Sequence, residues 1–193
     1  NEALLSCRIQ GQGIDFGRLP CGYTPLDIDT FAMDNSGTKK ELVGRTYAGV
    51  DGYCPIVSYL GTAGFCLELA LRPGVQHSAR ESEYDVERVL PMASRLVKTP
   101  IFCSQALMRT IAEQGKALER EVAFLIKWNP RSTPVERVAV QKVLGDGTVW
   151  SHPREGKRLC VWQEQVAVSG MDPKDQPVRR IYRLTERIID KHG

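Results

Sequence analysis

Apolar and polar residues alternate along the first part of the chain, as is typical of β-strands. Residues 24–31 (TPLDIDTF) place apolar and acidic side chains on opposite faces, because the side chains of a strand point alternately to its two sides. Residues 45–60 predict a strand on either side of a turn at residues 51–52, and residues 64–71 predict a further strand. Three successive strands with short turns indicate an antiparallel meander.

The spacing of apolar residues then changes to that of helices. A Ser-x-x-Glu capping box at residues 78–81 precedes apolar positions at helical spacing, which predicts a helix over residues 79–97 with a kink at Pro91. A second helix is expected to start near Ser104 and to end at Gly115, which is predicted to be the C′ residue of that helix. Residues 122–128 (VAFLIKW) form a near-continuous apolar run, as expected of a strand buried on both faces.

The last third of the chain is rich in predicted strands. One helix and three strands, separated by loops that bear proline and glycine, are expected there: residues 135–144, 148–151, 158–168 and 178–189. The sequence therefore predicts three parts. They are an irregular lead-in at residues 1–22, an α/β (α+β) core at residues 23–128 and a β-rich insertion at residues 129–193.

Composition restricts the class of protein without deciding it. The 193 residues are 42% hydrophobic and 25% charged, with a net charge of +3, which is typical of a globular chain and only permits a nucleic-acid partner. No run of eighteen apolar residues and no secretory signal is present, so no membrane-spanning helix is expected. Six scattered cysteines without a C-x-x-C pair favour reduced thiols and a cytoplasmic location.

Three aspartates lie within eight positions of the stretch at residues 26–41 (LDIDTFAMDNSGTKKE). Asp27 and Asp29 are expected to share one face of the first strand, while Asp34 precedes an Asn-Ser-Gly turn. Two acids on one strand face are suitable first oxygen ligands for a hard cation. The same residues also fit a surface turn that caps a strand, since Asp and Asn are common turn residues. Spacing alone leaves both interpretations open.

Basic residues in two regions predict contacts with nucleic acid. Arg179, Arg183 and Arg187 share one face of the last predicted strand. The candidate DNA contacts are Lys39, Lys40, Arg154, Lys157, Arg158, Arg179, Arg180, Arg183 and Arg187. A solvated strand face and an exposed lysine pair give the same pattern, so this alternative stays open. Trp150 and Trp162 fit either a base-stacking role or the core of the insertion.

Several blocks, in this order, resemble the catalytic core of the DDE transposases of bacterial insertion sequences. Together with residues 26–41 the resembling blocks cover essentially the whole chain: RTYAGVDGYCPIVSYLG, LALRPGVQHSARE, ERVLPMASRL, FLIKWNPRSTP, TVWSHPREGKR and VRRIYRLTER. The last three are similar to that family's β-rich insertion. The order β-β-β-α, then α-β, is that of a ribonuclease H-like fold with a mixed sheet.

The resemblance implies an enzyme of DNA transposition that cleaves and joins strands with three carboxylates and two Mg²⁺ (or Mn²⁺) ions. In the family the first acid is followed by Thr or Ser, which implies Asp29, before Thr30, as the catalytic and metal-binding acid, with Asp27 as second choice. The resemblance also implies transposon ends and target DNA as partners. A homodimer of the full-length protein and a nucleoid-associated location in a bacterial cytoplasm are implied as well.

Two departures from the family pattern predict an inactive fragment. The second acid of the family lies in a block resembling R-x-D-S-G-F at the end of the fourth strand, whereas this chain has only residues 99–103 (TPIFC) between its predicted helices. Five residues are too few for a usual strand with two connections, so the central strand is expected to be missing. The third acid is expected beyond Gly193. A single acid cannot hold two metals about 3.5–4 Å apart.

Three classes of function therefore remain open from the sequence. The first is a DDE transposase core, and the second is a remnant that binds DNA without catalysis. The third is an unrelated α/β domain in which Asp27 and Asp29 only cap a strand. For the activity of this chain itself, the loss of acids favours the second.

Overall fold

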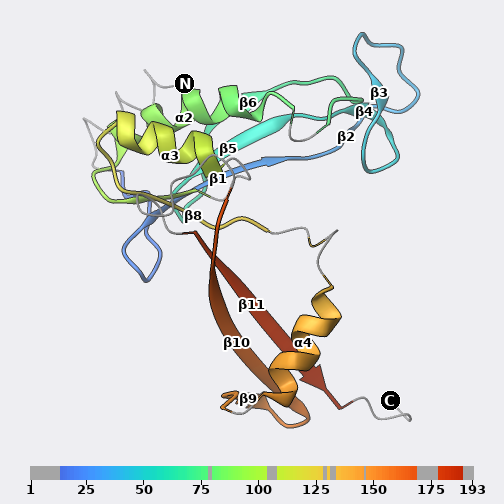
Figure 1. Cartoon of the computed structure of the whole chain (residues 1–193). Coiled ribbons are helices and arrows are strands. Elements are labelled where there is room, and N and C mark those ends of the chain that lie inside the picture. The colour runs from blue at the N-terminus through green and yellow to red at the C-terminus, as the bar shows by residue number, and fades with distance from the viewer. Residues whose placement is uncertain are drawn as a thin grey trace. The chain divides into compact units, whose positions relative to one another are not determined.

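The protein divides into two compact units, residues 1–127 and residues 128–193 (Figure 1). Its computed structural model describes residues 14–77, 80–103, 108–127, 130, 134–145, 147–168 and 178–188. The division falls one residue before the boundary expected from the sequence. Within the described residues, no helix is both long and apolar enough to span a membrane.

A five-stranded mixed sheet lies at the centre of unit 1. Its strands are β1 (Thr24–Thr30), β5 (Ile56–Leu60), β6 (Phe65–Ala70), β7 (Ile101–Cys103) and β8 (Val122–Phe124). They are ordered β6-β5-β1-β7-β8, with β1, β5 and β6 antiparallel in succession and with β7 and β8 parallel to β1. The acid-bearing strand β1 is therefore central, and the unit has a mixed α and β composition.

Strand β7 contradicts the prediction that no strand fits between the two helices. The Thr24 N–H donates to the Pro100 carbonyl at 2.9 Å and the Ile101 N–H donates to the Glu121 carbonyl at 3.1 Å, so the segment pairs on both sides. Ile101 and Cys103 are fully buried. The prediction assumed a strand of ordinary length, but three residues suffice because both neighbouring strands supply hydrogen-bond partners.

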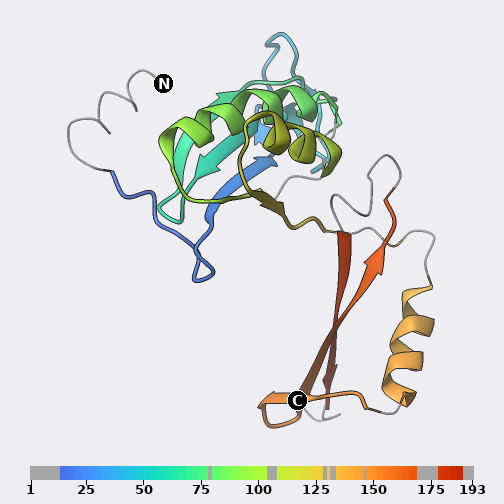
Figure 2. The ribbon, with the colours of Figure 1, turned by 60° about the vertical axis from the view of Figure 1, so that its left-hand side comes forward.

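Helices α2 (Ser82–Leu96) and α3 (Met108–Ala117) cover one face of this sheet (Figure 2). The apolar residues that join the helices to the strands form one core: Leu26, Ile28, Leu60, Val86, Val89, Leu90, Ala93, Ile101, Cys103 and Ile111. Full burial of one Val, Leu or Ile side chain contributes about 1.5–3 kcal/mol. The buried helix-to-sheet contact therefore stabilises unit 1.

Both helices differ from their predicted bounds at both ends, because α2 was expected over residues 79–97 and α3 over residues 104–115. Glu81, with φ 62°, is the N-cap of α2 and makes no side-chain capping bond, so it does not have the third helical position that the predicted capping box requires. The other end of that box, Ser78, lies outside the described residues. The helix runs on through Pro91. Gly115 lies inside α3 rather than beyond it, and an added Cβ would stand 3.3 Å from Cγ2 of Val122. This glycine therefore serves the close approach of β8, not a left-handed helix cap.

A small three-stranded sheet follows β1 in the chain. It consists of β2 (Met33–Asp34), β4 (Asp51–Tyr53) and β3 (Gly44–Arg45), in that spatial order. The predicted turn at residues 51–52 is wrong, because these residues pair within β4. The turn lies earlier, where the Gly49 N–H donates to the Thr46 carbonyl at 3.0 Å. Gly52 is needed for strand pairing, since a Cβ there would collide with the Met33 carbonyl oxygen.

The edge strand β8 is shorter and more exposed than the sequence suggests. Its three residues are only half-buried, and Leu125, which follows it, is 57% exposed. The apolar run predicted a strand covered on both faces, but β8 has a neighbour on one side only. Apolar composition does not distinguish an edge from a central position.

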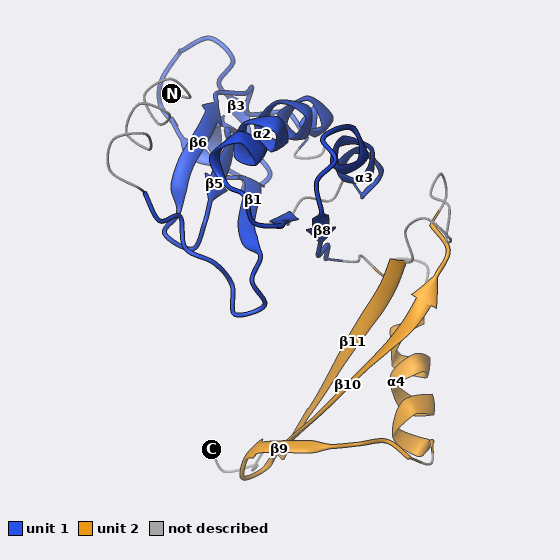
Figure 3. Cartoon of the chain, turned by 90° about the vertical axis from the view of Figure 1, so that its left-hand side faces the viewer, with its two compact units in different colours: residues 1–127 blue, residues 128–193 orange. Residues whose placement is uncertain are grey.

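Unit 2 consists of a helix beside a three-stranded antiparallel sheet (Figure 3). Its elements are α4 (Val135–Leu144), β9 (Ser151–Arg154), β10 (Lys157–Val166) and β11 (Val178–Arg187). The helix has the predicted bounds, whereas the strand predicted at residues 148–151 begins at Ser151. Strands β10 and β11 pair along ten residues each, from Lys157 opposite Arg187 to Val166 opposite Val178, and form a long two-stranded ribbon.

Candidate functional site

Strand β1 presents Asp27 and Asp29 on the face opposite helices α2 and α3. Leu26 and Ile28 are buried against the helices, and the two acids that alternate with them are exposed. Two positions apart on a strand means a separation of about 6.8 Å along the backbone. The prediction that both acids share one face is confirmed by this burial pattern.

The strands on either side of β1 bring no further acid to this face. Asp27 is paired with Tyr59 and Asp29 with Val57 of β5. On the other side, β7 ends at Cys103, opposite Leu26. The sequence contains no Asp or Glu from residue 88 to residue 112, so β7 and its flanks have no carboxylate. Among the described residues, no group of three or more His, Cys, Asp and Glu side chains could hold a metal ion.

These donors do not fit the two-metal site that the resemblance implies. Such a site clamps two ions about 3.5–4 Å apart between several carboxylates. Here the oxygen ligands come from one strand only, and Asp29 Oδ1 already accepts a hydrogen bond from the Thr30 N–H at 2.7 Å. The paired residues on β5, Tyr59 and Val57, are aromatic and apolar. The face therefore lacks the second strand of ligands that the chemistry requires.

Asp34 has the structural role predicted for it. Its Oδ1 accepts a hydrogen bond from the Ser36 N–H at 2.8 Å, which is an Asx turn at the end of β2. Hydrogen bonds from the side chain and backbone of Ser36 lower the pKa of Asp34. The carboxylate is engaged in closing its own turn.

Lys39 and Lys40 lie in the exposed loop between β2 and β3. Lys40 Nζ donates to Asn35 Oδ1 at 3.4 Å, within the same loop. The loop thus presents two adjacent cations to solvent, a geometry that fits both an exposed pair and a phosphate contact.

The β10–β11 ribbon divides the predicted DNA contacts of unit 2 between its two faces. Arg179, Arg183 and Arg187 of β11 are exposed on one face, together with half-buried Lys157, which is paired directly with Arg187. The remaining residues of this outer face are uncharged: Leu159, Val161, Gln163, Gln165, Ile181 and Thr185. Within the part of the chain that the structure describes, none of the four cations forms an ion pair with a carboxylate. The outer face carries four positive charges and no negative one.

The opposite, inner face of the ribbon contains the other two cations in ion pairs. Arg158 lies 2.5 Å from Glu186, and Arg180 lies 3.1 Å from Glu164. The sequence placed these arginines in one set with the outer cations, but strand parity separates them. Their charges are compensated within the protein, so they are less available to a ligand than those of the outer face.

In the described part of unit 2, Trp162 and Tyr182 belong to the inner face of the ribbon, and Trp150 lies beside Arg158 of that face. Trp162 stacks on Tyr182 with ring centroids 4.9 Å apart and planes 6° from parallel, and Lys142 of α4 stands 5.8 Å from the Trp162 ring. The guanidinium of Arg158 lies 4.2 Å from the centre of the Trp150 ring. Both tryptophans are half-buried and each has a ring contact within the protein, and Trp162, stacked on buried Tyr182, fits the core interpretation better than Trp150 does.

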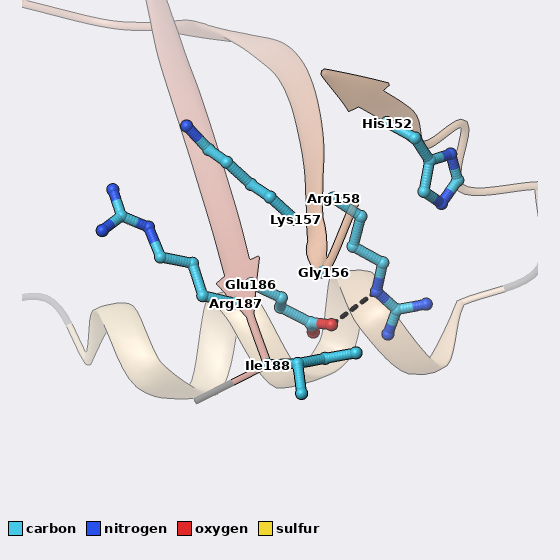
Figure 4. Close-up of a pocket in the computed structure, with 7 residues that line it drawn as sticks. All are labelled: His152, Gly156, Lys157, Arg158, Glu186, Arg187 and Ile188. Carbon is cyan, nitrogen blue, oxygen red and sulfur yellow. Dashed lines mark hydrogen bonds and ion pairs between the residues drawn. The ribbon is translucent and has the colours of Figure 1, made fainter. Parts of the chain in front are cut away.

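A shallow pocket of about 380 Å³ lies where the ribbon meets the turn between β9 and β10. It is lined by His152, Gly156, Lys157, Arg158, Glu186, Arg187 and Ile188. Lys157 and Arg187 project to one side, whereas the Arg158–Glu186 pair and His152 lie on the other (Figure 4). The pocket is therefore lined mainly by basic side chains, which come from both faces of the ribbon. Arg154 belongs to exposed β9 beside it.

A scan against protein-family models and searches of curated proteins and of solved structures gave no match. Function is therefore inferred from the place of the acids in the sheet and from the distribution of charge on the ribbon.

Proposed function

We propose that the chain derives from the catalytic core of a DDE transposase and that its own activity is DNA binding without strand cleavage. The observation that carries this proposal is the place of Asp27 and Asp29. They lie on the exposed face of the central strand of a mixed sheet built in the chain order β-β-β-α-β-α-β.

The sheet supports a ribonuclease H-like core. The first three strands of the sheet, β1, β5 and β6, form an antiparallel meander, and β7 and β8 follow as parallel strands connected through helices. The order β-β-β-α, then α-β, is the one implied by the resemblance, and β7 supplies the strand that was expected to be missing. The β-rich unit 2 has the place of the family's insertion.

The absence of a carboxylate beside Asp27 and Asp29 supports the proposal that this chain does not cleave DNA. β7 is the parallel neighbour of β1, where the family's second acid is expected, and neither it nor its flanks contain a carboxylate. An in-line displacement with two Mg²⁺ or Mn²⁺ ions needs ligands to both ions. With only Asp27 and Asp29 on this face, we expect this chain not to assemble that site.

The outer face of the ribbon supports retained DNA binding. Cations that are not neutralised within the protein bind phosphates by releasing the counterions of DNA, and this term does not require catalytic acids. Transposon ends and target DNA are the partners that follow from the proposed origin. A nucleoid-associated location in a bacterial cytoplasm and a dimer of the full-length protein belong to the same proposal.

A cleavage assay together with a binding assay tests this function. The purified chain is incubated with supercoiled plasmid and Mg²⁺ or Mn²⁺, and nicked product is measured against an Asp29→Ala variant. We expect the same background nicking from both proteins and a shift of the plasmid band at low salt. The expectation follows because the two carboxylates present cannot hold two ions.

Two results would contradict the proposal in different ways. Metal-dependent nicking above that of Asp29→Ala would show that cleavage has been retained. Absence of DNA binding even at low salt would favour an unrelated α/β domain, in which Asp27 and Asp29 only border a strand end.

A further inference from the structure

We infer that the outer face of the β10–β11 ribbon binds the backbone of duplex DNA, through about four phosphates and without reading base sequence. The inference rests on the proposed DNA binding and adds the binding surface, the form of nucleic acid and the number of contacts.

The charges of the outer face are uncompensated where they are closest. Lys157 and Arg187 are directly opposite each other on the two strands. Like charges in directly opposed positions destabilise a sheet, and neither side chain has a carboxylate partner in the described part of the chain. A phosphate between them would relieve this repulsion. Both side chains project to the same side of the ribbon (Figure 4), so one phosphate can approach the two together.

The spacing of the arginines suits a regular polyanion. Arg179, Arg183 and Arg187 recur every four residues along β11, which corresponds to about 14 Å per step and about 27 Å for the row. The phosphates of one strand of a duplex advance about 3.4 Å per nucleotide along the axis, so the row matches about eight base pairs.

The outer face lacks the groups that bind single strands. Such sites stack successive bases on aromatic side chains, and no aromatic residue belongs to the outer face of β10 and β11. Trp162 and Tyr182 stack on each other on the inner face, and Trp150 is covered by Arg158. Contacts from the outer face therefore depend on the phosphates, which favours a duplex and makes binding independent of sequence.

The inner face supplies a matched control. Arg180 belongs to the same strand as Arg183, but it is held 3.1 Å from Glu164 on the opposite face. Arg180→Gln and Arg183→Gln remove the same charge and alter the net charge of the chain equally. Only Arg183→Gln removes a cation from the outer face.

The experiment measures the salt dependence of DNA affinity. Fluorescence anisotropy of the full chain is recorded with a labelled duplex of about 20 base pairs, longer than the row, over a series of KCl concentrations. Four phosphate contacts predict a slope of log K against log salt of about −3.6, and Arg183→Gln is expected to reduce it to about −2.7. Arg180→Gln and the charge-preserving Arg183→Lys are expected to retain the original slope.

Two further probes are a second duplex of unrelated sequence and the single strand of the first. We expect equal affinity for the two duplexes and weaker binding of the single strand. Circular dichroism spectra that match the unsubstituted protein establish that each variant is folded.

The inference is overturned if the single strand binds as tightly as the duplex, or if Arg183→Gln leaves the slope unchanged. Either result, with DNA still bound, contradicts the surface assigned here and leaves the proposed DNA binding intact. If neither probe is bound by the unsubstituted protein, both proposals fail.

Discussion

Asp85 is a carboxylate buried in unit 1 where α2 packs on the sheet. Its Oδ1 lies 3.4 Å from Nη2 of Arg88, whose Nε donates to Glu68 of β6 at 2.8 Å. Burial raises the pKa of Asp85 above its usual value of 3.8, although the charges of Arg88 and Arg72 oppose the change. Because the folded protein disfavours the ionised carboxylate, it binds this proton more tightly than the unfolded chain does.

We predict that Asp85 makes stability decrease as pH rises. The free energy of unfolding falls wherever the folded state binds more protons, here from pH 3.8 upward through the raised pKa of Asp85. Asp85→Asn removes this titration. The free energy of unfolding of the variant is therefore expected to rise relative to that of the unsubstituted protein as pH increases through that range. Urea unfolding followed by circular dichroism at several pH values measures the difference.

The exposed carboxyl of Glu87, on the same helix, provides the control. Glu87→Gln removes the same negative charge from an exposed position, so it separates the loss of a charge on α2 from the loss of the buried carboxyl of Asp85. A difference between the unsubstituted protein and Asp85→Asn that stays constant over the pH range would contradict the prediction.

Single residues were predictable where their own chain neighbours decide their role. Asp34 closes a turn with Ser36, two residues away, and sequence reasoning placed it there. The role of Gly115 depends on Val122, which belongs to another element. Reasoning from the local sequence could only treat that glycine as a helix end, because the contact that requires it is tertiary.

Among the elements, β7 shows most clearly how tertiary pairing decides secondary structure. Three residues are too short to show an alternating pattern, yet this strand joins β1 to β8. The ribbon strands β10 and β11 are long enough for their period to be read, and α4 has clear helical spacing. The long elements were therefore predicted from the sequence, whereas three-residue β7 was not.

We predict that β7 contributes strongly to the stability of unit 1. Ile101 is completely buried, so Ile101→Ala is expected to lower the free energy of unfolding by about 2–5 kcal/mol. Leu69→Ala removes the same number of carbon atoms from the same sheet, but Leu69 is 53% exposed, and its loss is expected to cost less than about 1 kcal/mol. Chemical denaturation followed by circular dichroism compares the two. Equal losses would mean that β7 is not a core strand.

At the scale of the molecule, the acids and the outer face belong to different units. Asp27 and Asp29 are in residues 1–127, whereas the four outer cations are in residues 128–193. All three tryptophans of the chain also belong to residues 128–193, so tryptophan fluorescence reports on unit 2.

We predict that duplex DNA stabilises unit 2 directly. At a free DNA concentration about 100 times Kd, binding to the folded state alone adds about 2.7 kcal/mol to the free energy of unfolding. Denaturation followed by tryptophan fluorescence should show this gain both in the unsubstituted protein and in Ile101→Ala, because Ile101 lies in unit 1. Arg183→Gln should show a smaller gain at the same DNA concentration. A gain that disappears in Ile101→Ala would place the binding surface in unit 1.

The sequence by itself determined that β1 and helices α2, α3 and α4 form, the extent of α4 and the common face of Asp27 and Asp29. These features depend on side-chain period and on residues close in the chain. The tertiary structure decided that β7 is a strand, that β8 is an edge, and which cations of the ribbon are neutralised. The physical reason is that pairing partners and counter-charges come from distant segments: Glu186 neutralises Arg158 and Glu164 neutralises Arg180 only once β10 and β11 are in register.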